Sequence, residues 1–269
     1  MTEPTIHPTM DLLLRRKSVR AYTGQPVSDN VKAQILQAAV RAPTAGNQML
    51  YTIIEVQDQA LKDHLAVTCD NQPFIAAAPL VLLFLADYQR WEDYFTASGV
   101  DELCAQKGQE RRRPGEGDLF LACCDALIAA QTAVVAAEAL GLGSCYIGDI
   151  MENYEVHRQL FDLPRYVFPI SLVCFGYPTD QQKARPQPER FAPEHIIYQD
   201  RYRRLGEAEL QQMFQQRQAQ VFAGRAQVGE AANFGQLMYL RKFGAEFSVE
   251  MTRSVQAILR TWRGEESSR

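Results

Sequence analysis

The stretch LVLLFLA, residues 80–86, is an unbroken apolar run that predicts a β-strand buried on both faces near the centre of a sheet. Further runs rich in β-branched or aromatic residues predict its neighbours, at 51–56 (YTIIEV), 144–147 (SCYI) and 169–176 (PISLVCFG). Apolar residues at helical spacing predict helices around them, notably at 27–41 and 118–140. Helices and strands alternate without a regular βαβ rhythm, which favours an α+β fold with a mixed sheet sandwiched by helices.

The composition is that of an ordinary globular protein, with 46% apolar and 22% charged residues in a chain of 269. These values exclude whole-chain disorder, collagen and coiled-coil fibres. The net charge of −4 argues against a nucleic-acid-binding protein, so any positive site has to be local. The apolar stretch 119–140 contains Asp125 and Glu138, which predict a buried helix rather than a membrane span. Because the N-terminus carries no signal peptide pattern, we expect a cytoplasmic protein.

Motifs of metal and nucleophilic chemistry are missing from the sequence. The 6 cysteines form no CxxC pair and are expected to be free thiols of a reducing compartment, with no metal site. No HExxH, GxSxG, GxGxxG or P-loop motif occurs, and His64 and His157 are expected on the surface. The region 87–117 is polar, and its Arg111–Arg113 triplet is interpreted as part of a solvated loop or, less readily, as a partner site.

Two basic segments could together bind a phosphate group. The first is RRKSVR at 15–20, where arginine and lysine charges lie beside a serine hydroxyl. Alone it could equally be a solvated basic patch. The second is Lys183-Ala184-Arg185 in a proline-rich loop that follows the strand at 169–176. Alone it is an ordinary surface loop, but the two segments could close on one phosphate monoester.

Three further segments could contact a flat heterocycle. The turn APTAGNQ at 42–48 offers amide donors and acceptors, although by itself it is only a polar turn. Glycines flank the short strand in GLGSCYIGD at 141–149, and they would allow a ligand close to the backbone or simply end a helix and a strand. Gln72 adds a polar side chain just before the strand at 80–86.

These motifs, in this order, resemble the FMN-dependent nitroreductase family over roughly residues 10–200. The Tyr146-Ile147-Gly148 segment and the later Lys-x-Arg are most similar to the branch of oxygen-insensitive NADPH nitroreductases and flavin reductases. The resemblance implies a three-layer α/β/α domain at 1–205 with a central mixed sheet. A helical C-terminal extension at 206–269 would pack on a domain-entwined homodimer that holds two FMN molecules.

The resemblance also implies a set of FMN-binding residues and no catalytic protein residue. The ribityl phosphate would be met by Arg16, Lys17, Ser18, Arg20, Lys183 and Arg185. Pro43, Thr44, Ala45 and Asn47 would approach the flavin edge from the other subunit. Gln72 would reach the ribityl chain or the pyrimidine side, and Tyr146, Ile147 and Gly148 would line the ring.

The activity implied is electron transfer from NADPH or NADH to nitroaromatics, quinones or free flavins, with donor and acceptor using one pocket in turn. One alternative keeps the fold but performs reductive dehalogenation or flavin fragmentation. Another is a flavin-binding module without turnover. No nucleic-acid or membrane partner is expected.

Overall fold

A computed structural model describes residues 6–265, and they contain one four-stranded sheet. The strands are β1 (Tyr51–Glu55), β2 (Leu80–Asp87), β3 (Gly143–Ile147) and β4 (Val167–Gly176). They lie in the order β1-β2-β4-β3, and each neighbouring pair is antiparallel. The sheet is therefore less mixed than predicted, since parallel pairing within the described residues is limited to a bridge between Ser18 and Ser144. The α+β fold class is confirmed.

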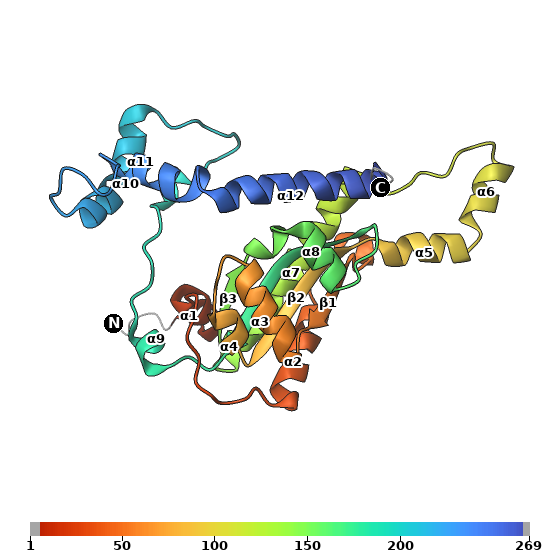
Figure 1. The fold of residues 1–269 in the computed structure, drawn as a ribbon, viewed down its shortest axis with the longest axis horizontal. Helices are drawn as coiled ribbons and strands as arrows, with labels where there is room; N and C mark the ends of the chain where they lie inside the picture. The colour runs from red at the N-terminus through yellow and green to blue at the C-terminus, as the bar shows by residue number, and fades with distance from the viewer. Residues whose placement is uncertain (1–5, 266–269) are drawn as a thin grey trace. The chain divides into compact units, whose positions relative to one another are not determined.

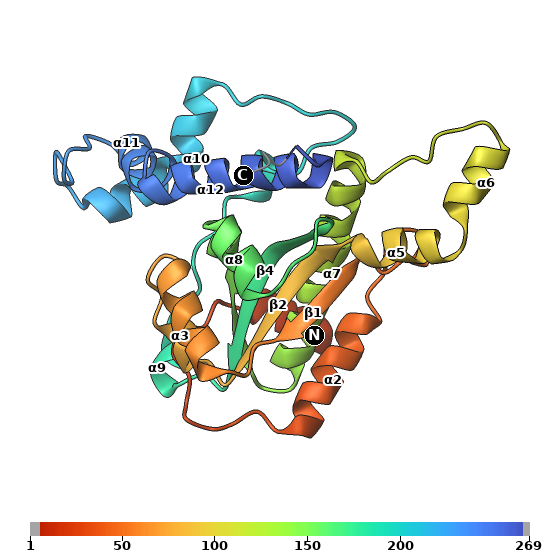
Figure 2. The same cartoon turned by 45° about the vertical axis from the view of Figure 1, so that its right-hand side comes forward.

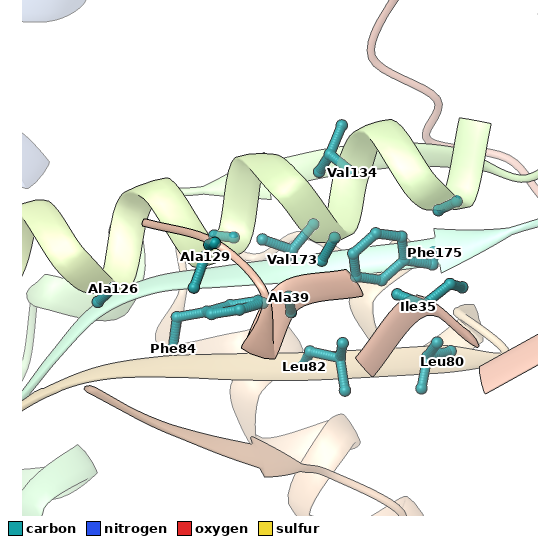
Figure 3. Close-up of a cluster of buried hydrophobic side chains, with 14 of the residues drawn as sticks. Ile35, Ala39, Leu80, Leu82, Phe84, Ala126, Ala129, Val134, Val173 and Phe175 are labelled. Carbon is teal, nitrogen blue, oxygen red and sulfur yellow. The ribbon is translucent and has the colours of Figure 1, made fainter. Parts of the chain in front are cut away.

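Strand β2 is buried along its whole length, as its unbroken apolar run predicts. Successive side chains point to opposite faces of a strand. Leu80, Leu82 and Phe84 accordingly pack against helices α2 (Asp29–Val40) and α7 (Glu116–Ala139), as Figure 3 shows. Val81, Leu83 and Leu85 pack in a second cluster on the opposite face. Helices α3 (Gln59–Thr68) and α4 (Phe74–Ala77) cover that face (Figures 1 and 2). The three-layer arrangement is confirmed.

Helix α7 is the central helix of this fold. By length and composition it could cross a membrane, and it is the one such helix in residues 6–265. In the structure it contacts α2 and all four strands, and ten of its residues are buried. It is a core helix, as its polar residues predict; the cytoplasmic location stays a prediction. Its small side chains, such as Ala126, Ala129 and Ala133, let it lie close to the sheet.

The polar region 87–117 is not the loop that the sequence predicts. It forms helices α5 (Gln89–Ala97) and α6 (Val100–Gln106), which project from the sheet in Figure 1. The Arg111 side chain is only 5% exposed, and it pairs with Glu92 at 2.8 Å and with Asp101 at 2.7 Å. Arg113 also pairs with Glu92. The interpretation of the triplet as solvated was wrong for Arg111, because the chain returns after α6 and brings this residue to carboxylates of both helices.

The chain divides into two compact units. The first runs to Pro186 and resumes at Met251, and the second is Gln187–Glu250. The first also holds α1 (Pro8–Arg15), α8 (Tyr154–Leu160), α9 (Asp180–Ala184) and most of α12 (Glu246–Arg263). Within it, Trp262 of α12 packs beside Leu119 and Ala122 of α7.

The second unit has its own elements and a small core. It contains α10 (Glu207–Phe222) and α11 (Phe234–Met238), which is followed by a π-helical turn at Tyr239–Phe243. Phe222, Ala231 and Leu237 form its buried cluster. The division of the chain into domains at residues 205 and 206 stays a prediction.

Candidate functional site

The first basic segment runs along the free edge of β3. Ser18 forms a bridge with Ser144, and the amide of Val19 donates to the Ser144 carbonyl at 2.8 Å. This close approach requires glycine at 143, because a Cβ there would lie 2.4 Å from Cγ2 of Val19. Gly176, its partner across the β3–β4 pair, is also crowded, because a Cβ there would lie 2.7 Å from Cδ1 of Tyr22 and from Cδ of Pro79. The two glycines thus create the space that the basic segment occupies.

The second basic segment is brought against the first. The amide of Thr23 donates to the Tyr177 carbonyl at 2.8 Å, so the chain after β4 runs beside the chain after the basic segment. The Lys17 ammonium donates to the Lys183 carbonyl at 2.6 Å and also to the Arg185 carbonyl. The Arg185 guanidinium in turn donates to the Ser18 carbonyl. Lys17 and Lys183 are 166 residues apart in the sequence, and their two segments meet, as their composition suggested.

A pocket of about 330 Å³ opens at this junction. Its charged lining consists of Arg15, Lys17, Lys183 and Glu138. Burial raises the pKa of Glu138 to about 7, although the nearby Arg16 and Arg15 act in the opposite direction. The Oε1 atom of Glu138 has no hydrogen-bond partner within residues 6–265. Apart from this carboxyl group, the charged lining is positive and suits an anionic ligand.

The predicted turn at 42–48 lies at a different place along α7. The amide of Ala45 donates to Asp125 at 2.9 Å. Glu138, in contrast, lies beside the two basic segments at 15–20 and 183–185, which together form the basic cluster. Asp125 and Glu138 are 13 residues apart on one helix, which corresponds to about 20 Å. The structure therefore does not bring Pro43, Thr44, Ala45 and Asn47 to the basic cluster of the same chain. Sequence reasoning did not identify Asp125 as a site residue, because no short motif links it to the turn.

Gln72 lies beside the segment that follows β3. Its side-chain amide donates to Oδ2 of Asp149 at 2.8 Å and to the Cys69 carbonyl at 2.9 Å. Gln72 and Gly148 are thus held in one place by Asp149, a residue absent from the predicted set although it directly follows Gly148. The negative charge of Asp149 is a feature that any ligand at Gly148 would meet.

The two other residues of this predicted segment point to opposite faces of β3. Tyr146 packs toward the α7 layer, and its hydroxyl donates to Gln131 at 3.2 Å. Burial raises the pKa of that hydroxyl to about 12. Ile147 has its side chain in the opposite core cluster. A ligand beside β3 could therefore contact the backbone of Ile147, whereas the side chain of Ile147 belongs to the core.

His157 is buried, contrary to the surface position expected for it. It is 0% exposed, with Nδ1 2.8 Å from the Ile150 carbonyl and Nε2 2.8 Å from Oγ1 of Thr68. Burial lowers the pKa of its imidazole. The histidine on α8 thus contacts Thr68 of α3 and the Ile150 carbonyl, and its role is structural. None of the six cysteines, all of them in the described part of the chain, forms a disulfide.

Comparisons with known proteins agree with this architecture. The model of the nitroreductase family matches residues 13–177, more than half of the chain. An FMN reductase [NAD(P)H] of Bacillus subtilis is 34% identical over 190 residues, which are 71% of this chain and 72% of that protein. An oxygen-insensitive NADPH nitroreductase of Salmonella typhimurium is 31% identical over 202 residues, 74% of this chain and 77% of the relative.

A solved structure shows the same fold. The oxidoreductase YcnD of Bacillus subtilis superimposes with a TM-score of 0.76 at 28% identity, over 94% of this chain and 98% of that one. The family match at residues 13–177 includes all four strands and the basic segment at the sheet edge. The chain belongs to the nitroreductase family.

Proposed function

We propose that the protein is an FMN-dependent oxidoreductase that takes electrons from NADPH or NADH. The observation that carries the proposal is the meeting of two basic segments beside β3, at a pocket whose charges are mostly positive. A terminal phosphate monoester, such as that of FMN, fits this set of donors. The names of the relatives, an FMN reductase and an NADPH nitroreductase, support the same cofactor and donor.

The residues at the junction divide into two roles in this proposal. Arg16, Ser18, Arg20, Lys183 and Arg185 supply charges and a hydroxyl to the phosphate. Lys17 has its ammonium on the carbonyls of residues 183 and 185, so it also holds the second segment in place. The isoalloxazine or ribityl part would contact Gln72, Tyr146 and Gly148. Ile147 would contribute its backbone, because its side chain lies in the core.

The site is completed by a second subunit in our proposal. Pro43, Thr44, Ala45 and Asn47 lie about 20 Å along α7 from the basic cluster, so they would serve the partner's cofactor. Helix α7 also has an exposed apolar stripe, which includes Leu121 at 48% and Ile128 at 40% exposure. An exposed apolar patch of this kind is typical of a protein interface. We therefore propose a homodimer joined through α7.

When bound, FMN supplies the hydride and electron chemistry, for which nitroaromatics, quinones or free flavins are the proposed acceptors. The polypeptide binds the phosphate, orients the ring and leaves one face open to small molecules. Donor and acceptor would occupy that face in turn, which predicts ping-pong kinetics. Because an open face suits many planar acceptors, we expect broad acceptor specificity.

The test is an anaerobic series of half-reactions. Protein purified and supplied with FMN should be yellow, should be bleached by NADPH or NADH, and should recover its colour with a nitroaromatic, a quinone or free FMN. Lys183→Ala combined with Arg185→Ala should weaken FMN binding at least tenfold. Failure to bind FMN at all would overturn the proposal.

The same series separates the alternatives. Bound FMN that neither nicotinamide reduces would indicate a flavin-binding module without turnover. Flavin that NADPH reduces and only a halogenated aromatic reoxidises would indicate reductive dehalogenation. Loss of the flavin chromophore itself during turnover would indicate flavin fragmentation.

A further inference from the structure

The buried carboxylate of Asp125 joins the two ends of the loop at 44–50. Asp125 lies on α7 and is 2% exposed. Its Oδ1 accepts from the amide of Ala45 at 2.9 Å, and its Oδ2 accepts from the amide of Leu50 at 3.1 Å. We propose that Asp125 is a positioning residue for the flavin site, which holds this loop in its binding conformation without touching the cofactor.

The loop needs such support because its backbone is unusual. Gly46, Asn47 and Met49 all adopt positive φ angles, of 55°, 57° and 52°. Residues other than glycine pay an energetic penalty in this region and remain there only when surrounding contacts require it. The amide of Met49 donates to Oγ1 of Thr44 at 3.3 Å, but that contact lies within the loop. Asp125 ties the loop to the core.

The carboxylate and the loop depend on each other. A buried charge is costly unless it is hydrogen-bonded, and the two backbone amides provide one donor to each oxygen of Asp125. Removing either oxygen leaves a loop amide without its acceptor. The position of the loop therefore depends on each carboxylate oxygen of Asp125, a residue of α7 outside the loop.

This inference rests on the proposed function, since the loop carries Pro43, Thr44, Ala45 and Asn47. A loop already in place loses less conformational entropy when ligand binds, so the affinity is higher. A second contact comes from α5, where the indole of Trp91 donates to the Gln48 carbonyl at 2.8 Å. Asp125 holds the ends of the loop and Trp91 holds its middle.

The test is Asp125→Asn, which keeps the shape but replaces one acceptor oxygen with a donor. Asp118→Asn is the matched control, because Asp118 lies on the same helix and accepts from the Gly115 amide at 2.8 Å rather than from an amide of the loop. We expect the Kd of apoprotein for FMN to rise roughly tenfold in Asp125→Asn. The control should keep the wild-type Kd.

Two readouts distinguish positioning from general destabilisation. Hydrogen exchange of the Ala45 and Leu50 amides, measured without FMN, should accelerate in Asp125→Asn and stay slow in Asp118→Asn. The visible spectrum of bound FMN should also shift in Asp125→Asn alone. Unchanged exchange, an unchanged spectrum and an unchanged Kd in a folded Asp125→Asn protein would overturn the inference.

Trp91→Phe covers the case in which Asp125→Asn does not fold. This change removes the indole donor and keeps an aromatic ring against the core cluster, so faster exchange in the loop and weaker FMN binding are again expected. Wild-type binding and exchange in this variant would contradict the argument. If wild-type protein binds no FMN, the proposed function fails, whereas the exchange measurement still decides whether Asp125 holds the loop.

Discussion

Burial disfavours the ionised form of the Glu138 carboxyl group, so the stability of the protein should depend on pH through this one residue. Burial raises the pKa of this carboxyl group to about 7 in the folded protein, against about 4.3 in an unfolded chain. The Glu138 carboxyl group therefore binds a proton more tightly in the folded protein than in the unfolded chain. The resulting stabilisation is fully present below pH 4 and is lost as the pH rises through 7.

Glu138→Gln should remove this pH dependence while it preserves the shape of the side chain. Relative to the variant, wild-type protein should lose about 1–2 kcal/mol of unfolding free energy between pH 5 and pH 8, after allowance for partial exposure. Urea unfolding at both pH values measures the difference. Glu110→Gln, at an exposed position, is the control. An equal change in unfolding free energy between pH 5 and pH 8 in wild type and Glu138→Gln would contradict the prediction.

Single residues also show what sequence alone could foresee. Their position before an apolar stripe makes Ser28 or Asp29 the expected helix cap, and in the structure the Ser28 hydroxyl accepts from the Val31 amide at 3.4 Å. The burial of His157 could not be foreseen, because its partners Thr68 and Ile150 lie on elements that only the folded chain brings together. Residues whose role is local were predictable, whereas residues whose role depends on distant partners were not.

At the scale of elements, Gly143 decides whether the basic segment can lie on β3. A Cβ at this position would meet Cγ2 and Cβ of Val19 at 2.4 and 2.8 Å. Gly143→Ala should therefore push residues 18–20 away from the strand and destabilise the protein by about 1–3 kcal/mol. Because those residues are part of the proposed phosphate site, FMN binding should weaken as well.

Gly117→Ala is a suitable comparison for this prediction. Gly117 lies in α7, and no atom is within 4 Å of the place where its Cβ would be. Alanine in a helix should stabilise the protein by a few tenths of a kcal/mol up to about 1 kcal/mol. Calorimetry and FMN titration of both variants provide the measurement. A Gly143→Ala protein with wild-type stability and affinity would show that β3 and the basic segment are not in such close contact.

Among the helices and strands too, those with a local sequence pattern were predictable, and those that depend on distant partners were not. The run at 80–86 was predictable because a strand buried on both faces needs no polar partner. Helices α5 and α6 were not, because charged residues conceal the apolar pair Trp91 and Phe95, which lie four residues apart on α5. The burial of Arg111 depends on Glu92 and Asp101 from those two helices. Ion pairs across a chain reversal leave no periodic pattern in a sequence.

At the scale of the whole molecule, one chain holds both halves of the proposed site but separates them. The basic cluster lies near Glu138 of α7, and the loop at 44–50 lies on Asp125. Leu121 and Ile128 form part of an exposed apolar stripe on the same helix. Pairing two copies through this stripe would cover the apolar surface and bring the loop of one subunit toward the basic cluster of the other.

Ile128→Asp therefore should yield monomers, because an aspartate at the proposed interface would lose water without gaining a partner. The dimer Kd should rise roughly a hundredfold or more, and FMN affinity should fall with it, since each site would lack the partner's loop. Sedimentation and FMN titration across a range of protein concentrations test both effects. Val67→Asp, at a 64% exposed apolar position on α3, should change neither. A dimeric Ile128→Asp protein with wild-type FMN affinity would exclude α7 as the interface.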